Sequence, residues 1–155
     1  MDPTKSRETK EQRRRGGDHF FALRYDVLRS PEFSALSAIA VKLLLDLVSQ
    51  FSGTNNGDLS PSWRLMKARG WKSKDTLDRA LRELVERQWL VRTRPGGRNL
   101  AALYAMTFRS IDECGRKHDI APTTRPGDDW RRGHAPLVLH TAAERRDIKA
   151  PAFPA

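Results

Sequence analysis

The sequence predicts a small α+β domain, mainly α-helical, and three observations lead to this fold class. An apolar stretch with a helical repeat covers residues 38–51. Two shorter amphipathic stretches, 61–69 and 74–88, predict a pair of helices joined by a tight turn. Two runs of β-forming residues, 89–94 and 100–108, are separated by Pro-Gly-Gly and predict a hairpin. The expected domain therefore has a three-helix core followed by a C-terminal β-hairpin.

The first half of the domain is the most apolar part of the chain. Residues 19–28 (HFFALRYDVL) predict either a short strand or an irregular segment over the core. Ser37 is placed to cap the helix 38–51. This helix is apolar over most of its girth, so it must be covered on two sides. Either residues 19–28 or a second copy of the chain supplies the second cover. The stripe comprises Ala40, Leu43, Leu44, Leu47, Val48 and Phe51, and Val41 and Leu45 widen it.

The two shorter helices have recognisable start and stop signals. Ser60 before Pro61 predicts the start of the first helix. Gly70 is suited to the left-handed conformation that ends a helix. Ser73 predicts the cap of the second helix, 74–88. The turn between the helices is therefore only a few residues long, which sets them at a steep angle.

The charge of the chain is strongly positive and unevenly distributed. Lys and Arg number 29 against 19 Asp and Glu, a formal net charge of +10. Residues 55–110 hold twelve basic and five acidic side chains, an excess of seven. A basic folded segment repels itself and points to a polyanionic partner, usually nucleic acid. No apolar run is long enough for a membrane helix, and the single Cys114 forms no internal disulfide. We therefore expect a cytoplasmic protein with no membrane association.

The two ends of the chain are polar. Residues 1–18 contain Arg13, Arg14 and Arg15 and predict a flexible basic arm. Residues 114–155 are rich in proline and predict a largely disordered tail. The predicted domain thus covers residues 19–113, and we expect it to fold without residues 119–155.

Catalysis is not expected from this sequence. Cys114 and His118 are four residues apart, but no second pair follows at metal-ligand spacing. Pro95-Gly96-Gly97 lacks the Lys-Ser/Thr that completes a phosphate-binding loop. No enzymatic activity, metal or cofactor is therefore predicted. The remaining histidines are scattered at His19, His134 and His140.

Residues 59–97 resemble the winged helix-turn-helix family of DNA-binding domains, and their sequence is LSPSWRLMKARGWKSKDTLDRALRELVERQWLVRTRPGG. Within the family this stretch is most similar to small single-domain bacterial regulators and to initiator-type proteins of plasmids and phages. The resemblance implies that helix 74–88 enters the major groove and that the hairpin, the wing, contacts the flanking backbone or minor groove. Physical size agrees, because a helix fits a major groove about 12 Å wide.

Candidate DNA contacts follow from the resemblance and from helical geometry. Arg79 and Arg82 suit bidentate contacts to guanine. Asp75 and Asp78 can accept from cytosine or orient the arginines. The groove-facing candidates are Ser73, Lys74, Asp75, Thr76, Asp78, Arg79 and Arg82. The phosphate-contact candidates are Ser60, Ser62, Arg64, Lys67 and Lys72. The wing candidates are Arg92, Arg94, Arg98 and Asn99, and the arm candidates are Arg13, Arg14 and Arg15.

The sequence therefore predicts a sequence-specific binder of double-stranded DNA that regulates transcription, most simply by repression through occupancy of a site. Two alternatives stay open. The first is a DNA-binding protein of a mobile element, acting in plasmid or phage replication initiation. The second is a winged helix that binds another protein. A homodimer through helix 38–51 and segment 19–28 would match a palindromic site.

Overall fold

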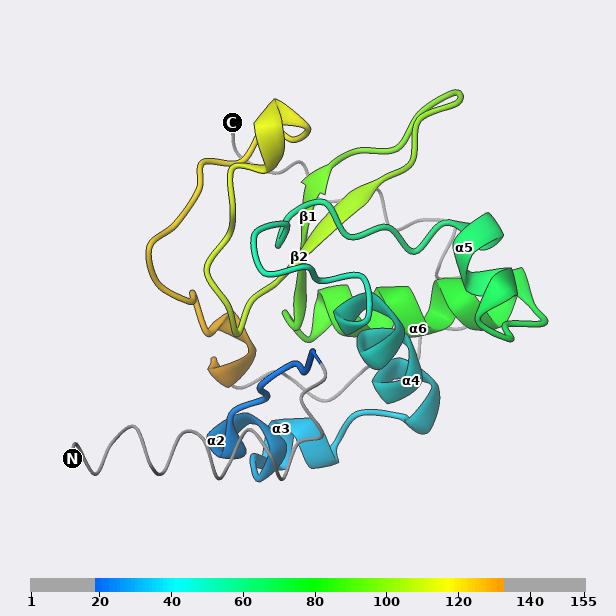
Figure 1. Ribbon diagram of the computed structural model, residues 1–155. Coiled ribbons are helices and arrows are strands. Elements are labelled where there is room, and N and C mark those ends of the chain that lie inside the picture. The colour runs from blue at the N-terminus through cyan, green and yellow to red at the C-terminus, as the bar shows by residue number, and fades with distance from the viewer. Residues whose placement is uncertain (1–18, 133–155) are drawn as a thin grey trace.

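A computed structural model describes residues 19–132 of the chain, and residues 1–18 and 133–155 lie outside the described part (Figure 1). The fold is a small α+β arrangement that is mainly helical and carries an antiparallel β-hairpin. The helices are α2 (Tyr25–Leu28), α3 (Pro31–Ser34), α4 (Ala38–Val48), α5 (Trp63–Ala68) and α6 (Lys74–Glu86). The strands are β1 (Leu90–Arg94) and β2 (Leu103–Met106), and two 3-10 turns follow at Cys114–Arg116 and Asp129–Arg131.

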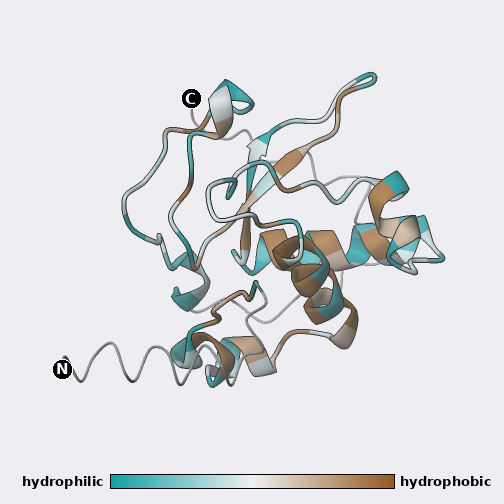
Figure 2. Cartoon of the chain, viewed as in Figure 1, coloured by the Kyte–Doolittle hydropathy of each residue, from teal (hydrophilic) through white to brown (hydrophobic). Residues whose placement is uncertain are grey.

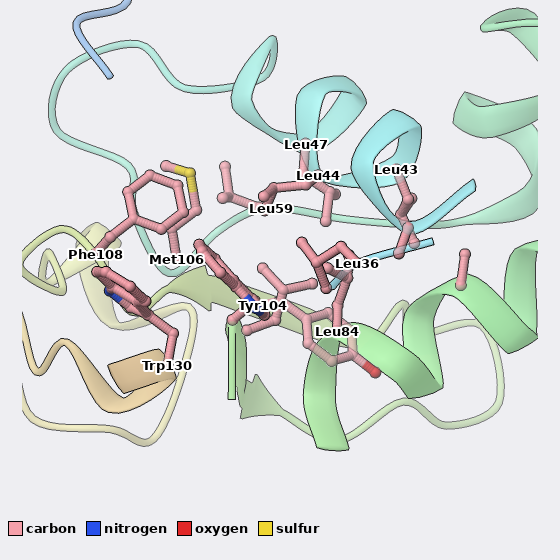
Figure 3. Close-up of a cluster of buried hydrophobic side chains, with 14 of the residues drawn as sticks. Leu36, Leu43, Leu44, Leu47, Leu59, Leu84, Tyr104, Met106, Phe108 and Trp130 are labelled. Atoms are coloured by element: carbon pink, nitrogen blue, oxygen red, sulfur yellow. The ribbon is translucent and has the colours of Figure 1, made fainter. Parts of the chain in front are cut away.

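The core lies where α4, α6 and the hairpin meet (Figure 3). α4 and α6 each bury one apolar face, as the helical repeat predicted, and the two helices are in contact. Trp89, which precedes β1, is completely buried. Figure 2 shows the same segregation, with apolar residues concentrated on α4 and on the inner side of α6. The buried helix residues include Ala40, Leu43, Leu44 and Leu47 of α4 and Leu77, Ala80 and Leu84 of α6.

The hairpin has a third, very short partner. β1 and β2 pair antiparallel, with Arg92 opposite Tyr104. Leu59, which precedes α5, bonds to the outer edge of β2. The Leu59 N–H donates to Tyr104 O (3.2 Å), and the Leu59 carbonyl oxygen accepts from Tyr104 N (2.9 Å). The connection between α4 and α5 therefore joins the sheet, and it ties the helices to the hairpin.

The helix ends follow the predicted signals in most places. Ser37 caps α4 by accepting from Ala40 N (3.2 Å), and Ser73 caps α6 by accepting from Thr76 N (3.3 Å). Gly70 has φ +89°, as expected for the end of a helix. The predicted start at Ser60-Pro61 is wrong, since α5 begins at Trp63. Gln50 bonds both the N–H and the C=O of Ser60 (both 2.9 Å) and holds this residue in an extended connection.

Residues 19–28 form neither a strand nor a wholly irregular segment. α2 is a single helical turn, and Ser30 caps the following turn, α3, by accepting from Phe33 N (3.1 Å). The segment packs against the core beside the end of α4, because Phe21 lies edge-on to Phe51 with ring centroids 5.7 Å apart and Val27 is fully buried in the core cluster. Part of the apolar girth of α4 is thereby covered within one chain, whereas Leu45 is 51% exposed.

The prediction of a largely disordered tail from residue 114 is wrong for residues 114–132. Trp130 is 1% exposed and stacks on Trp89, with ring centroids 5.0 Å apart (Figure 3). Asp128 N donates to Thr107 O (2.9 Å), which brings the segment back to the end of β2. A tryptophan buries enough apolar area to hold a polar, proline-rich segment in place. The folded unit thus extends beyond the predicted boundary at 113, and the domain is not complete at residue 118. Within residues 19–132, none of the helices has the length and apolarity to cross a membrane.

Candidate nucleic-acid interface

α5, a short turn and α6 form a compact unit at one end of the molecule (Figure 1). Trp71 N donates to Met66 O (3.1 Å), which closes the turn after Gly70. Lys74 Nζ lies 5.8 Å from the centre of the Trp63 ring, so the first turns of both helices are neighbours. The N-terminal end of α6 is consequently presented beside α5 rather than covered by it.

A buried carboxylate anchors this turn to α4. Asp46 is 6% exposed and accepts from Trp71 Nε1 (2.7 Å), Lys42 Nζ (2.7 Å) and Arg69 Nε (3.1 Å). Burial by itself raises the pKa of Asp46, but the hydrogen bonds from Lys42, Trp71 and Arg69 outweigh it and hold the pKa below its ordinary value. Asp46 therefore stays ionised, and it fixes the turn between α5 and α6 against α4.

The outward face of α6 is mixed in charge. Asp75 pairs with Arg79 (3.2 Å), and Arg79 Nη2 also donates to Thr76 Oγ1 (3.4 Å). Asp78 and Arg82 are exposed on the same helix. Such an exposed pair contributes little to stability, and a phosphate or a base can displace it. Within the described residues, Arg82 is the α6 arginine that no hydrogen bond or ion pair engages.

The candidate phosphate contacts divide into two groups. Arg64 and Lys67 are exposed on α5, and Lys72 is exposed in the turn. The hydroxyl of Ser73 already caps α6, and Ser60 is half-buried between α4 and α5. Ser62, the residue before α5, is also half-buried. The cations of this set are thus available to a partner, whereas Ser60 and Ser62 are half-buried. Ser73, which was predicted to face the groove and not to bind phosphate, has a structural role as the cap of α6.

The hairpin presents two of its four candidates at the tip. Arg98 and Asn99 are exposed between Gly97 and Leu100, which pair with one another, and Asn99 has φ +60°. Arg92 lies on β1 opposite Tyr104 and is exposed. Arg98 is therefore an exposed cation at the tip of the hairpin.

Tyr104 is a residue of β2, and its side chain is buried. Burial raises the pKa of the Tyr104 hydroxyl, while nearby Arg92 opposes the shift and Asp78 adds to it.

Arg94, the fourth wing candidate, is the last residue of β1 and does not lie at the tip of the hairpin. Its Nη2 donates to Ala101 O (2.8 Å) and its Nη1 donates to Lys117 O (3.1 Å). One carbonyl belongs to the arm of the hairpin that leads into β2, and the other belongs to the loop after β2. The reason is positional, because Arg94 ends β1 at the point where the chain after β2 returns.

The three arginines of the predicted arm, Arg13, Arg14 and Arg15, lie outside the described residues. Asp46 was missed as a residue of this site. An acidic residue inside an otherwise apolar helix, four positions after Lys42, is the signal that could have found it. The partner Trp71 could not be found in this way, because it is distant in sequence.

Cys114 and His118 are neighbours in the structure as well as in the sequence. A Cβ atom at Gly57 would lie 2.5 Å from His118 Nε2 and 3.3 Å from Cys114 Sγ. His118 Nε2 is 2.8 Å from Asp112 O, which occupies the nitrogen nearest to Gly57. Across residues 19–132, no group of three or more His, Cys, Asp or Glu side chains is placed to hold a metal ion.

Comparisons with models of protein families, with curated proteins and with solved structures find no match to this chain. The interpretation of the site therefore depends on its geometry and charge.

Proposed function

We propose that this protein binds double-stranded DNA through a winged helix-turn-helix formed by α4, α5, α6 and the β1–β2 hairpin. These elements follow one another in the order that the family requires. The Leu59–Tyr104 bridge stands where the family has a short strand, between α4 and α5. The observation that carries the proposal is the common direction of the basic elements. In Figure 1, α5, the start of α6 and the tip of the hairpin all extend to the right-hand side.

The exposed cations of these elements supply the two kinds of contact that a specific DNA binder needs. Arg82 on α6 is exposed, has no hydrogen bond or ion pair within residues 19–132, and suits bidentate recognition of guanine in the major groove. Arg64 and Lys67 on α5 suit phosphate contacts, which position the protein without reading sequence. Arg98 at the wing tip suits the backbone or the minor groove beside the site. Regulation of transcription by occupying such a site is the simplest function for this arrangement.

The experiment starts with selection of a preferred duplex from a randomised DNA pool by the full-length protein. Binding to that duplex and to a scrambled duplex is then measured by fluorescence anisotropy across a salt series. We expect a clear preference for the selected duplex and an affinity that falls steeply with salt. Equal binding to both duplexes would contradict sequence specificity, and no binding at low salt would contradict DNA binding altogether.

Single substitutions assign the contacts. Arg82→Ala is expected to lose about 1–3 kcal/mol on the selected duplex and to relax base preference at one position. Arg98→Ala is expected to weaken binding to both duplexes and to lower the salt slope by about one. Arg125→Ala is a control with the same charge change, because Arg125 is exposed on the segment after β2, far along the chain from α6. If Arg82→Ala and Arg125→Ala have the same effect, recognition lies elsewhere.

A further inference from the structure

In this subsection the wing is residues 95–102, the part of the hairpin beyond the last strand pair, Arg94 and Leu103, and that pair is its base. The loop that follows β2 (residues 111–119) returns to this base (Figure 1). Arg94, the last residue of β1, donates from Nη1 to Lys117 O (3.1 Å) in this loop. It donates from Nη2 to Ala101 O (2.8 Å) on the opposite arm of the wing. Its Nε is buried and has no hydrogen-bond partner among the described residues. The guanidinium group therefore faces inward and joins three pieces of chain at one point.

The same loop is bonded to its surroundings on both sides of Arg94. Asp119 N donates to Thr93 O (3.3 Å), and Thr93 Oγ1 donates to Gly57 O (2.7 Å). Lys117 Nζ donates to Asp58 Oδ2 (2.6 Å). The hydrogen bond to Asp58 raises the pKa of Lys117, so the Lys117 ammonium stays charged. The loop is thus held against β1 and against the connection before α5, and it provides a fixed point for Arg94.

A two-stranded hairpin is marginally stable in water unless it packs against other structure. The wing beyond Arg94 has few such contacts, since residues 95–101 are all exposed. Its direction relative to α6 must consequently be set at the base. Arg94 is the side chain that connects both arms of the wing to the loop there.

We propose that Arg94 is a positioning residue that fixes the direction of the wing, and that it does not contact DNA. The consequence for DNA rests on the proposed function. A wing held in place presents Arg98 and Asn99 without further ordering, so binding loses less conformational entropy. Because the planar fork of Arg94 donates to two carbonyls at once, lysine at this position keeps the charge but not the connection.

The test compares Arg94→Lys and Arg94→Ala with Arg98→Ala in the full-length protein. Amide hydrogen exchange is measured by NMR at Gly97 and Leu100, whose N–H groups close the wing (2.9 and 3.1 Å). Binding is measured on the selected duplex across a salt series. We expect both Arg94 variants to exchange faster at the two amides and to lose about tenfold in affinity with an unchanged salt slope. Arg98→Ala is expected to leave exchange unchanged and to lower the slope by about one.

The proposal is overturned if Arg94→Ala lowers the salt slope by about one while wing exchange stays as in the wild type, since Arg94 would then be a phosphate contact. It is also overturned if Arg94→Lys matches the wild type in exchange and affinity. If the wild-type protein binds no duplex, the proposed function fails. Exchange at Gly97 and Leu100 still decides, in that case, whether Arg94 holds the wing.

Discussion

Trp130 gives the sharpest test of the corrected domain boundary. Its ring is 1% exposed, is stacked on Trp89, and donates from Nε1 to Asp128 Oδ1 (3.1 Å). A tryptophan that buries about 200 Å² contributes about 5 kcal/mol at about 25 cal/mol per Å². Truncations of large buried aromatic residues to alanine cost about 3–5 kcal/mol. We therefore expect Trp130→Ala to lower the free energy of unfolding by about 3–5 kcal/mol, a large part of the stability of a small domain.

Urea denaturation followed by far-ultraviolet circular dichroism measures this change. Fluorescence is less suitable, because the emission of Trp89 depends on the neighbouring ring. Arg132→Ala is the control, since this residue is exposed and forms only a surface pair with Asp129 (3.1 Å); we expect a change within about 0.5 kcal/mol. A loss of less than about 1 kcal/mol for Trp130→Ala would refute the packing of residues 114–132 on the domain.

Two further predictions concern buried positions. Asp46→Ala is expected to cost about 2–3 kcal/mol of unfolding free energy, because Trp71 loses its charged hydrogen-bond partner. The pKa of Asp46 is lowered by folding, so its contribution is complete above about pH 4 and disappears as the pH falls through that lowered pKa; the variant should lack this acid-dependent part in denaturation series at several pH values. Gly57→Ala is expected to cost about 1–3 kcal/mol, because its Cβ would lie 2.5 Å from His118 Nε2 at a φ of +138°. Gly97→Ala, with nothing within 4 Å, should have almost no effect on the melting temperature, and equal effects of the two changes would contradict the close packing at Gly57.

The longer elements of this fold could be predicted from the sequence because they repeat. α4, α6 and the two strands each contain enough residues to show a helical or alternating pattern, and the structure has all of them with ends shifted by a few residues. α2 and α3 are single turns of four residues. A single turn contains no repeat, so the composition of residues 19–28 suggested either a short strand or an irregular segment, and residues 31–34 gave no signal for a helical turn.

The packed segment after β2 could not be predicted for a different reason. Its composition is polar and rich in proline, which is typical of disorder. One tryptophan and a few backbone bonds, such as Asp128 N to Thr107 O, are sufficient to dock it. Such contacts depend on the tertiary position of Trp89 and Thr107, and no local pattern contains that information.

The candidate site was predictable in its location but not in the availability of its side chains. The cap at Ser73, the glycine that ends α5 and the basic character of the region all follow from local sequence. Whether a given arginine is free depends on partners that are distant along the chain. Arg94 and Arg82 are indistinguishable by charge, yet one bonds two carbonyls and the other is unengaged within the described structure.

This difference between engaged and unengaged cations determines how much of the net positive charge can contact the phosphates of DNA. Part of the positive charge neutralises carboxylates of the same chain. Lys42 and Arg69 form ion pairs with Asp46, Lys117 forms one with Asp58, and Arg87 lies 3.8 Å from Glu83. These cations cannot release counterions from DNA without breaking a contact that the fold uses. Within residues 55–110, Arg69 and Arg87 are paired in this way and Arg94 bonds two backbone carbonyls. The salt dependence of binding, which counts the phosphates that are neutralised, should therefore be shallower than the number of basic residues in that range suggests. It should depend on the exposed cations of α5, α6 and the wing tip, and a slope that matched the full count would mean that the internal pairs open on DNA.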